Sequence, residues 1–164
     1  MRALLDGTLP PVPFPAGLSV RAVGDADTEA LGELMLRAYE GTLDDQGLVL
    51  EDHVDVAART MAGQFGPLRP DASFVATPAG SGVLAGATIV TTWRELPLLA
   101  FALVRPSWQN RGVGTALLTR SGQALRAAGD REWTLAVTRH NPAVRLYRRL
   151  GFHEDQSLIR RSPT

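Results

Sequence analysis

The apolar run Leu98–Val104 is the feature that most constrains how this chain can fold. Its seven residues carry no polar or charged side chain, a pattern typical of a strand that is buried on both faces. A helical pattern follows from about Gly112 to Ala128 and ends at Gly129, and a second strand is predicted over Trp133–Val137. A strand, a helix and a strand in this order predict two parallel strands joined by a right-handed crossover.

The rest of the sequence predicts further elements around this unit. We expect strands over Leu18–Arg21, Ser73–Thr77, Val83–Trp93 and Glu154–Arg160. We also expect three helices: one that ends near Tyr39, one over Glu51–Gln64 and one over Pro142–Leu150. Antiparallel strands first and a parallel unit later imply an α+β fold, with one mixed central sheet flanked by helices. We place this single domain at residues 18–164, behind an irregular proline-rich lead-in at residues 1–17.

The composition excludes several classes of function. The chain has no cysteine and no lysine, so cysteine nucleophiles, thiolate metal sites, Schiff-base lysines and phosphate-gripping P-loops are ruled out. The three histidines lie far apart in the sequence, and no metal site is expected. We see neither an apolar run long enough to span a membrane nor an export signal, so the expected location is the cytoplasm.

Charge is balanced overall but unevenly distributed along the chain. Residues 1–104 carry 6 Arg and 13 Asp or Glu, a net charge of −7, whereas residues 105–164 carry 11 Arg and 4 Asp or Glu, a net charge of +7. This asymmetry is what an anionic ligand on the second half would require, although solvated surfaces would also produce it. A nucleic-acid-binding protein is not expected, because such proteins are more often basic overall.

The segment Gln109–Thr115 carries the strongest local signal, because it joins the buried strand to the helix. The first N–H groups of a helix lack intrahelical partners and bind anions. Gly112 and Gly114 would let a phosphate approach the backbone, or would serve only tight packing. The third glycine of a dinucleotide-binding fingerprint would fall at Leu117, so a Rossmann fold is not predicted.

A second segment, Asn141–Phe152, follows the second parallel strand. Ligands of open α/β sheets bind at the carboxyl ends of the strands, so both segments should face one crevice. Together they resemble the two motifs of the GNAT superfamily of acyl-CoA-dependent N-acyltransferases. The first resembles its [QR]-x-x-G-x-[GA] pyrophosphate loop, and the second its Asn-x-x-Ala/Val-x-x-Leu-Tyr-x-x-x-Gly-Phe helix.

The resemblance implies acetyl-CoA as the cofactor, with no metal, and it assigns cofactor contacts to residues of both motifs. These are Leu103, Val104, Gln109, Asn110, Arg111, Gly112, Val113, Gly114, Thr115, Asn141, Ala143, Tyr147 and Arg148. The backbone of Leu103 and Val104 would pair with the pantetheine arm, and the Val104 amide would polarise the thioester carbonyl. Asn141 would bind the pantetheine, and Tyr147 would stand near the sulfur as a general acid.

The expected reaction is attack of an amine on the thioester within a ternary complex. A fixed N–H stabilises the charge that develops on the carbonyl oxygen, and a tyrosine hydroxyl can protonate the departing thiolate. The acceptor would be a primary amine of a small molecule or a peptide, held near Tyr39, Glu40, Asp44 and Asp45 of an acidic loop. A homodimer is left open.

The general base is where the sequence departs from the family. Leu98 stands where several members carry a glutamate in the strand before the loop. Glu95 is our tentative base, and a residue of the Glu40–Asp45 loop, His53 and water are the alternatives. Because that glutamate is missing, a non-catalytic acyl-CoA-binding sensor or scaffold is the alternative function.

Overall fold

The computed structural model describes residues 1–7 and 9–156. They form a six-stranded sheet with the order β1-β6-β5-β4-β3-β2. The strands are β1 (Arg2–Leu4), β2 (Leu18–Ala22), β3 (Phe74–Pro78), β4 (Gly86–Trp93), β5 (Leu96–Val104) and β6 (Glu132–Leu135). The helices are α1 (Thr28–Tyr39), α2 (Leu50–Met61), α3 (Val113–Ala127) and α4 (Val144–Arg149).

The sheet is mixed, as the sequence predicts. The pairs β2–β3, β3–β4 and β4–β5 are antiparallel, and so is the pair β1–β6. The pair β5–β6 is parallel and encloses α3 in the chain, which confirms the predicted strand–helix–strand unit. The sheet therefore changes from antiparallel to parallel at β5, beside the loop that the sequence singled out.

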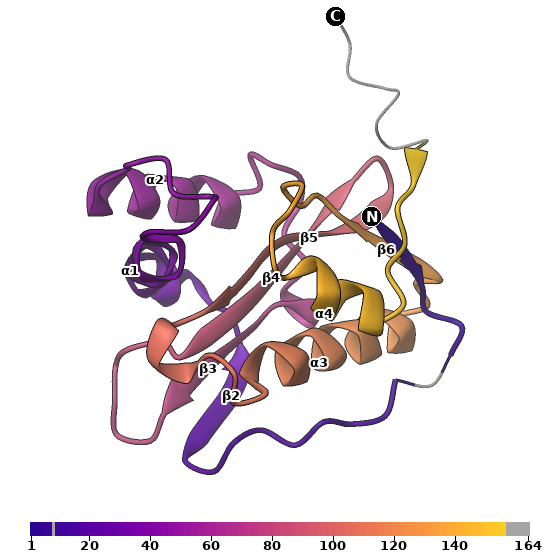
Figure 1. Cartoon of the computed structure of the whole chain (residues 1–164), viewed down its shortest axis with the longest axis horizontal. Coiled ribbons are helices and arrows are strands. Elements are labelled where there is room, and N and C mark those ends of the chain that lie inside the picture. The colour runs from indigo at the N-terminus through magenta and orange to yellow at the C-terminus, as the bar shows by residue number, and fades with distance from the viewer. Residues whose placement is uncertain (8, 157–164) are drawn as a thin grey trace, which may run out of the picture.

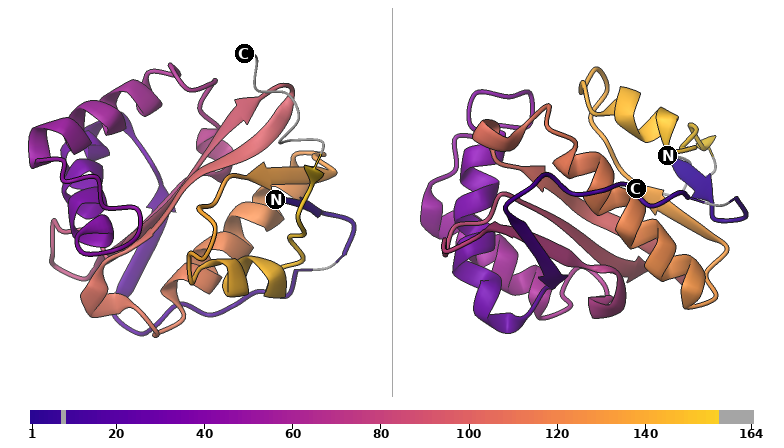
Figure 2. Two further views of the ribbon diagram at one scale, coloured as in Figure 1. Left: turned by 45° about the horizontal axis from the view of Figure 1, so that its top comes forward. Right: turned by 90° about the horizontal axis from the view of Figure 1, so that it is seen from below.

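Helices cover both faces of the sheet (Figure 1). Helices α1 and α2 lie together on one face, and α3 and α4 lie on the other. Figure 2 shows the same layers from two further directions. The core under α1 and α2 includes Leu31, Leu34, Met35, Ile89 and Leu103. The core under α3 and α4 includes Val90, Leu118, Leu125, Trp133 and Phe152.

The two ends of the sheet differ from the prediction. Residues 1–17 were expected to be irregular, but Arg2–Leu4 form β1, which pairs with β6. The last predicted strand, Glu154–Arg160, is not seen in its first three residues, and residues 157–160 lie outside the described part of the chain. Its neighbour His153 makes only an isolated bridge with Arg2.

Several predicted bounds also shift by a few residues. Helix α2 ends at Met61 rather than near residue 64, because Gly63 takes a left-handed φ of 79°. Strand β4 begins at Gly86, three residues after the predicted start at Val83. Within residues 1–7 and 9–156, no helix is both long and apolar enough to cross a membrane.

Candidate acyl-coenzyme A site

The centre of the candidate site is the place where β5 and β6 stop pairing, which we call the opening. The two strands pair only at Leu98–Thr134 and Leu99–Leu135, and β5 then runs on to Val104 without β6 beside it. On its other side β5 stays paired with β4, through a register shift that leaves Ala100 without a partner. The last part of β5 therefore has one edge that no strand covers, and this edge faces the opening.

Backbone groups of Val104 point into this opening. The N–H of Arg105 donates to the C=O of Ala85 beside β4, at 2.8 Å. Successive residues of a strand direct their N–H and C=O groups to opposite edges, so Val104 faces the opening and Leu103 faces β4. Ala102 shares the orientation of Val104. Leu103, which the sequence predicts as a pantetheine contact, therefore directs its backbone groups toward β4 rather than toward the opening.

The loop before α3 forms an open cradle of N–H groups. The first hydrogen bond of α3 runs from the Ala116 N–H to the Gly112 C=O, which leaves the N–H groups of Val113, Gly114 and Thr115 without intrahelical acceptors. They lie at the positive end of the helix dipole. The cradle can therefore hold a phosphate.

The two glycines of this loop have different roles. Gly112 takes a φ of 83°, and a Cβ atom there would have open space around it. Gly114 packs instead, because its Cβ atom would lie 3.3 Å from Val104 Cγ2 and 3.7 Å from Leu146 Cδ2. Close packing, one of the two readings of this pair, thus applies to Gly114, and Gly112 leaves the space that phosphate approach would need.

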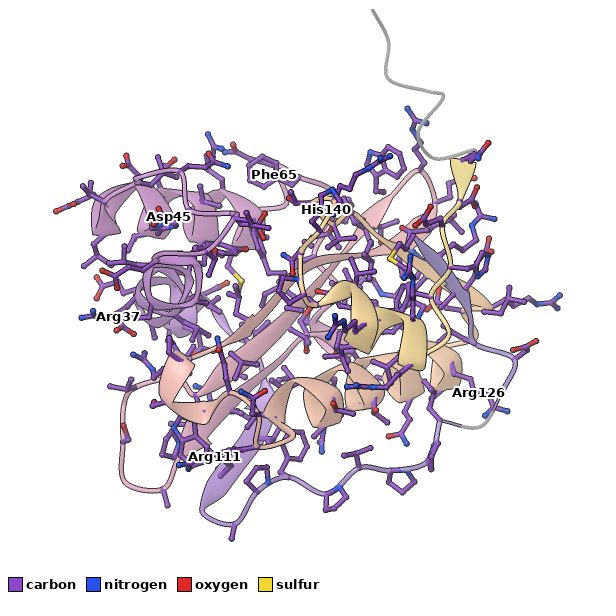
Figure 3. All side chains as sticks on the ribbon, in the orientation of Figure 1. Arg37, Asp45, Phe65, Arg111, Arg126 and His140 are labelled. Atoms are coloured by element: carbon purple, nitrogen blue, oxygen red, sulfur yellow. The ribbon has the colours of Figure 1, made fainter. Side chains whose placement is uncertain are left out.

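Two polar side chains extend the cradle. The Gln109 side chain donates to the Val104 C=O at 3.2 Å, so it reaches the rim of the opening. The guanidinium of Arg111 lies over the ring of Trp108, 5.0 Å from its centre. Arg111 marks the cradle end of α3 in Figure 3, and Arg126 marks the opposite end. Arg148, a further expected contact, instead pairs with Glu154 at 3.1 Å.

Tyr147 lies on α4, the helix that follows β6. Its ring packs edge-on against Phe152, with the ring centres 5.9 Å apart, and its side chain is buried. Burial, together with the charge of Asp44, raises the pKa of its hydroxyl. The phenol is therefore neutral at physiological pH and can act as a proton donor.

Asn141 is held in a fixed orientation before α4. Its Oδ1 accepts a hydrogen bond from the Ala143 N–H at 2.8 Å, and its Nδ2 donates to Asp44 at 2.6 Å. The sequence predicts Asn141 as the N-cap, but α4 begins at Val144 and Ala143 occupies the cap position. Asn141 therefore stabilises the turn before the helix.

The acidic loop between α1 and α2 borders the opening only in part. Burial, and then the neighbouring Asp44 and Tyr147, raise the pKa of the Tyr39 hydroxyl to about 12. Asp45 accepts hydrogen bonds from two backbone N–H groups of its own loop. Glu40 is exposed and lies 3.7 Å from Arg37.

Glu95, the tentative base, lies apart from the site. It occupies the turn between β4 and β5 with a φ of 67°, next to the pair Trp93–Leu96. A strand advances about 3.3 Å per residue, which puts Glu95 roughly 30 Å from Val104 along β5. His53, one of the alternatives, is buried and its ring centre lies 6.1 Å from that of Tyr39.

Comparisons with known proteins agree with this geometry. The family model of the acetyltransferase (GNAT) domain matches residues 70–154, and the chain belongs to this family. No curated protein matches the chain.

Among solved structures, the chain resembles a GCN5-related N-acetyltransferase from Sphaerobacter thermophilus, with 25% identity and a TM-score of 0.70. The match covers 93% of this chain but only 46% of that one. An aminoglycoside N-acetyltransferase in complex with CoA is 20% identical, with a TM-score of 0.63 and coverage of 87% and 92%. The ribosomal-protein-S18-alanine N-acetyltransferase of Escherichia coli is 22% identical, with a TM-score of 0.62 and coverage of 84% and 79%.

Proposed function

We propose that the protein transfers an acetyl group from acetyl-CoA to a primary amine of a small molecule or a peptide, by direct attack in a ternary complex. The observation that carries the proposal is the free edge of β5, which leads from Val104 directly to the N–H cradle of α3. An extended pantetheine arm can pair with that edge while the pyrophosphate occupies the cradle.

The Val104 N–H supplies the electrophilic assistance. The amine nitrogen attacks the thioester carbon, and negative charge develops on the carbonyl oxygen before the C–S bond breaks. A fixed N–H donor at that oxygen is worth about 3 kcal/mol in comparable sites. Its orientation is set in advance, because the neighbouring Arg105 N–H is bound to Ala85.

Tyr147 is the proposed general acid. Its neutral hydroxyl gives its proton to the thiolate sulfur as the C–S bond breaks, and it regains a proton from solvent. Thiolates are tolerable leaving groups, so we expect Tyr147→Phe to lower kcat roughly 100-fold without abolishing turnover.

His53 is the proposed acceptor of the proton that the attacking amine loses. Glu95 is remote, and the Asp45 carboxylate is bound to the backbone of its own loop. The ring centre of His53 lies 6.1 Å from that of Tyr39, one of the predicted acceptor contacts. A neutral imidazole nitrogen can accept such a proton, and histidine is the side chain that most often acts as a general base.

A panel of amines, with acetyl-CoA and a thiol reagent, tests the proposal. It should include aminoglycosides, polyamines and peptides with a free α-amine, because relatives act on both small molecules and a ribosomal protein. We expect amine-dependent release of free thiol that is reduced in Tyr147→Phe. Tight acetyl-CoA binding without release from any amine would instead favour the non-catalytic acyl-CoA-binding module, for which Leu98 in place of the family glutamate is the supporting observation.

A further inference from the structure

The carboxylate of Asp44 joins two segments that are far apart in the sequence. One oxygen accepts a hydrogen bond from the Thr138 hydroxyl and the other accepts one from the Asn141 amide, both at 2.6 Å. Thr138 and Asn141 follow β6, whereas Asp44 belongs to the loop between α1 and α2. Each oxygen of Asp44 thus has a hydrogen-bond partner within the protein.

The loop that carries Asp44 is itself organised to hold this position. Gly41 and Gly47 take left-handed φ values of 73° and 68° at its two ends. The neighbouring Asp45 accepts hydrogen bonds from both of their N–H groups, each at 2.8 Å. The loop is therefore closed on itself around Asp45, and Asp44 projects from a defined backbone.

The segment between β6 and α4 contacts Asp44 through Thr138 and Asn141. Between the end of β6 and the start of α4, residues 136–143 contain neither helix nor strand. Within this segment, Asn141 has its Oδ1 bound to the Ala143 N–H and its Nδ2 bound to Asp44. One N–H of Nδ2 is left for a ligand, because the amide carries two. Its direction is set by the bond to Asp44.

We infer that Asp44 is a positioning residue that presents the Asn141 amide to the pantetheine of acyl-CoA. Asp44 thereby couples the acidic loop between α1 and α2 to the cofactor site. The inference rests on the proposed function. Any ligand that stabilises the loop also stabilises the cofactor contact, and the reverse holds equally by linkage. Acyl-CoA binding therefore also stabilises the acceptor side, rather than only supplying the acetyl group.

Calorimetric titration with acetyl-CoA, in the absence of any amine, tests this assignment. We expect Asp44→Ala to weaken acetyl-CoA binding about tenfold and Thr138→Val, which removes one hydroxyl, to weaken it about threefold. In an Asn141→Ala background, Asp44→Ala should have little further effect, because its route to the cofactor is already gone. The matched control is Asp55→Asn, which removes an exposed carboxylate of α2 whose partner is Arg59.

The outcomes separate the inference from the function on which it rests. If Asp44 bound only the acceptor amine, Asp44→Ala would raise the acceptor KM and leave the acetyl-CoA affinity unchanged, which would overturn the inference alone. If the losses of acetyl-CoA affinity caused by Asp44→Ala and by Asn141→Ala multiplied in the double variant, the inference would also be overturned. Should the wild-type protein fail to bind acetyl-CoA, both would fall. Thr138→Val carries the test if Asp44→Ala does not fold.

Discussion

Replacement of Gly112 by glutamate or by glutamine separates charge from backbone effects at the cradle. Both side chains would have open space, and both would meet the same strain at a φ of 83°, about 1–2 kcal/mol of folding free energy. They differ in one negative charge beside the proposed pyrophosphate. For a separation of about 6 Å and an effective dielectric constant of about 40, each charge pair costs about 1.4 kcal/mol. Two phosphate charges then cost about 3 kcal/mol, or roughly 100-fold in Kd.

The assay is acetyl-CoA titration of both variants at low and high salt. Gly112→Glu should bind roughly 100-fold more weakly than Gly112→Gln, and salt should narrow the difference because it screens exposed charges. Gly129 offers a matched control at the other end of α3, since it has a φ of 97° and open space around it. Gly129→Glu should leave the affinity unchanged. Equal affinities of the two Gly112 variants would refute the placement of the pyrophosphate.

Three further predictions concern packing, pH and the base. Gly32→Ala should lower the free energy of unfolding by about 2 kcal/mol in urea titrations, because its Cβ would lie 2.5–2.7 Å from atoms of Val54; wild-type stability would contradict this. Arg21 and then the Gly24 N–H hold the pKa of Asp27 low against the effect of burial. Asp27 therefore stabilises the fold above its unfolded pKa, and this stabilisation is lost as the pH falls through its lower folded pKa. Asp27→Asn should cost about 1–2 kcal/mol at neutral pH and little in acid, and a cost independent of pH would be the wrong outcome. His53→Gln should lower kcat at neutral pH but not at alkaline pH, where the amine is already deprotonated; a uniform loss across the pH profile would exclude His53 as the base.

The part of the fold that the sequence predicts best is the unit around α3. The apolar run of β5, the helical pattern and the following strand are each marked by local residue patterns, and all three appear in the structure. Strand β1 was missed for a physical reason. Its three residues are too few for a periodic pattern, and they become a strand only because β6 offers them a free edge.

The site shows the same division between local and long-range information. The cradle is local, since two glycines and a helix start mark it in the sequence. Which of Leu103 and Val104 faces the opening is not marked locally, because it depends on which edge of β5 is paired with β4. Glu95 is close to the apolar run in sequence, yet a tight turn puts it at the far end of the strand. The contacts of Asp44 with residues nearly a hundred positions away have no local signature.

A crystal structure of the protein with coenzyme A tests the central claim most directly. We expect the pyrophosphate within hydrogen-bond distance of the N–H groups of Val113, Gly114 and Thr115, with the pantetheine arm between β5 and β6 and its sulfur near Tyr147. Coenzyme A bound on another face, or a pantetheine arm that does not enter the opening beside Val104, would contradict it.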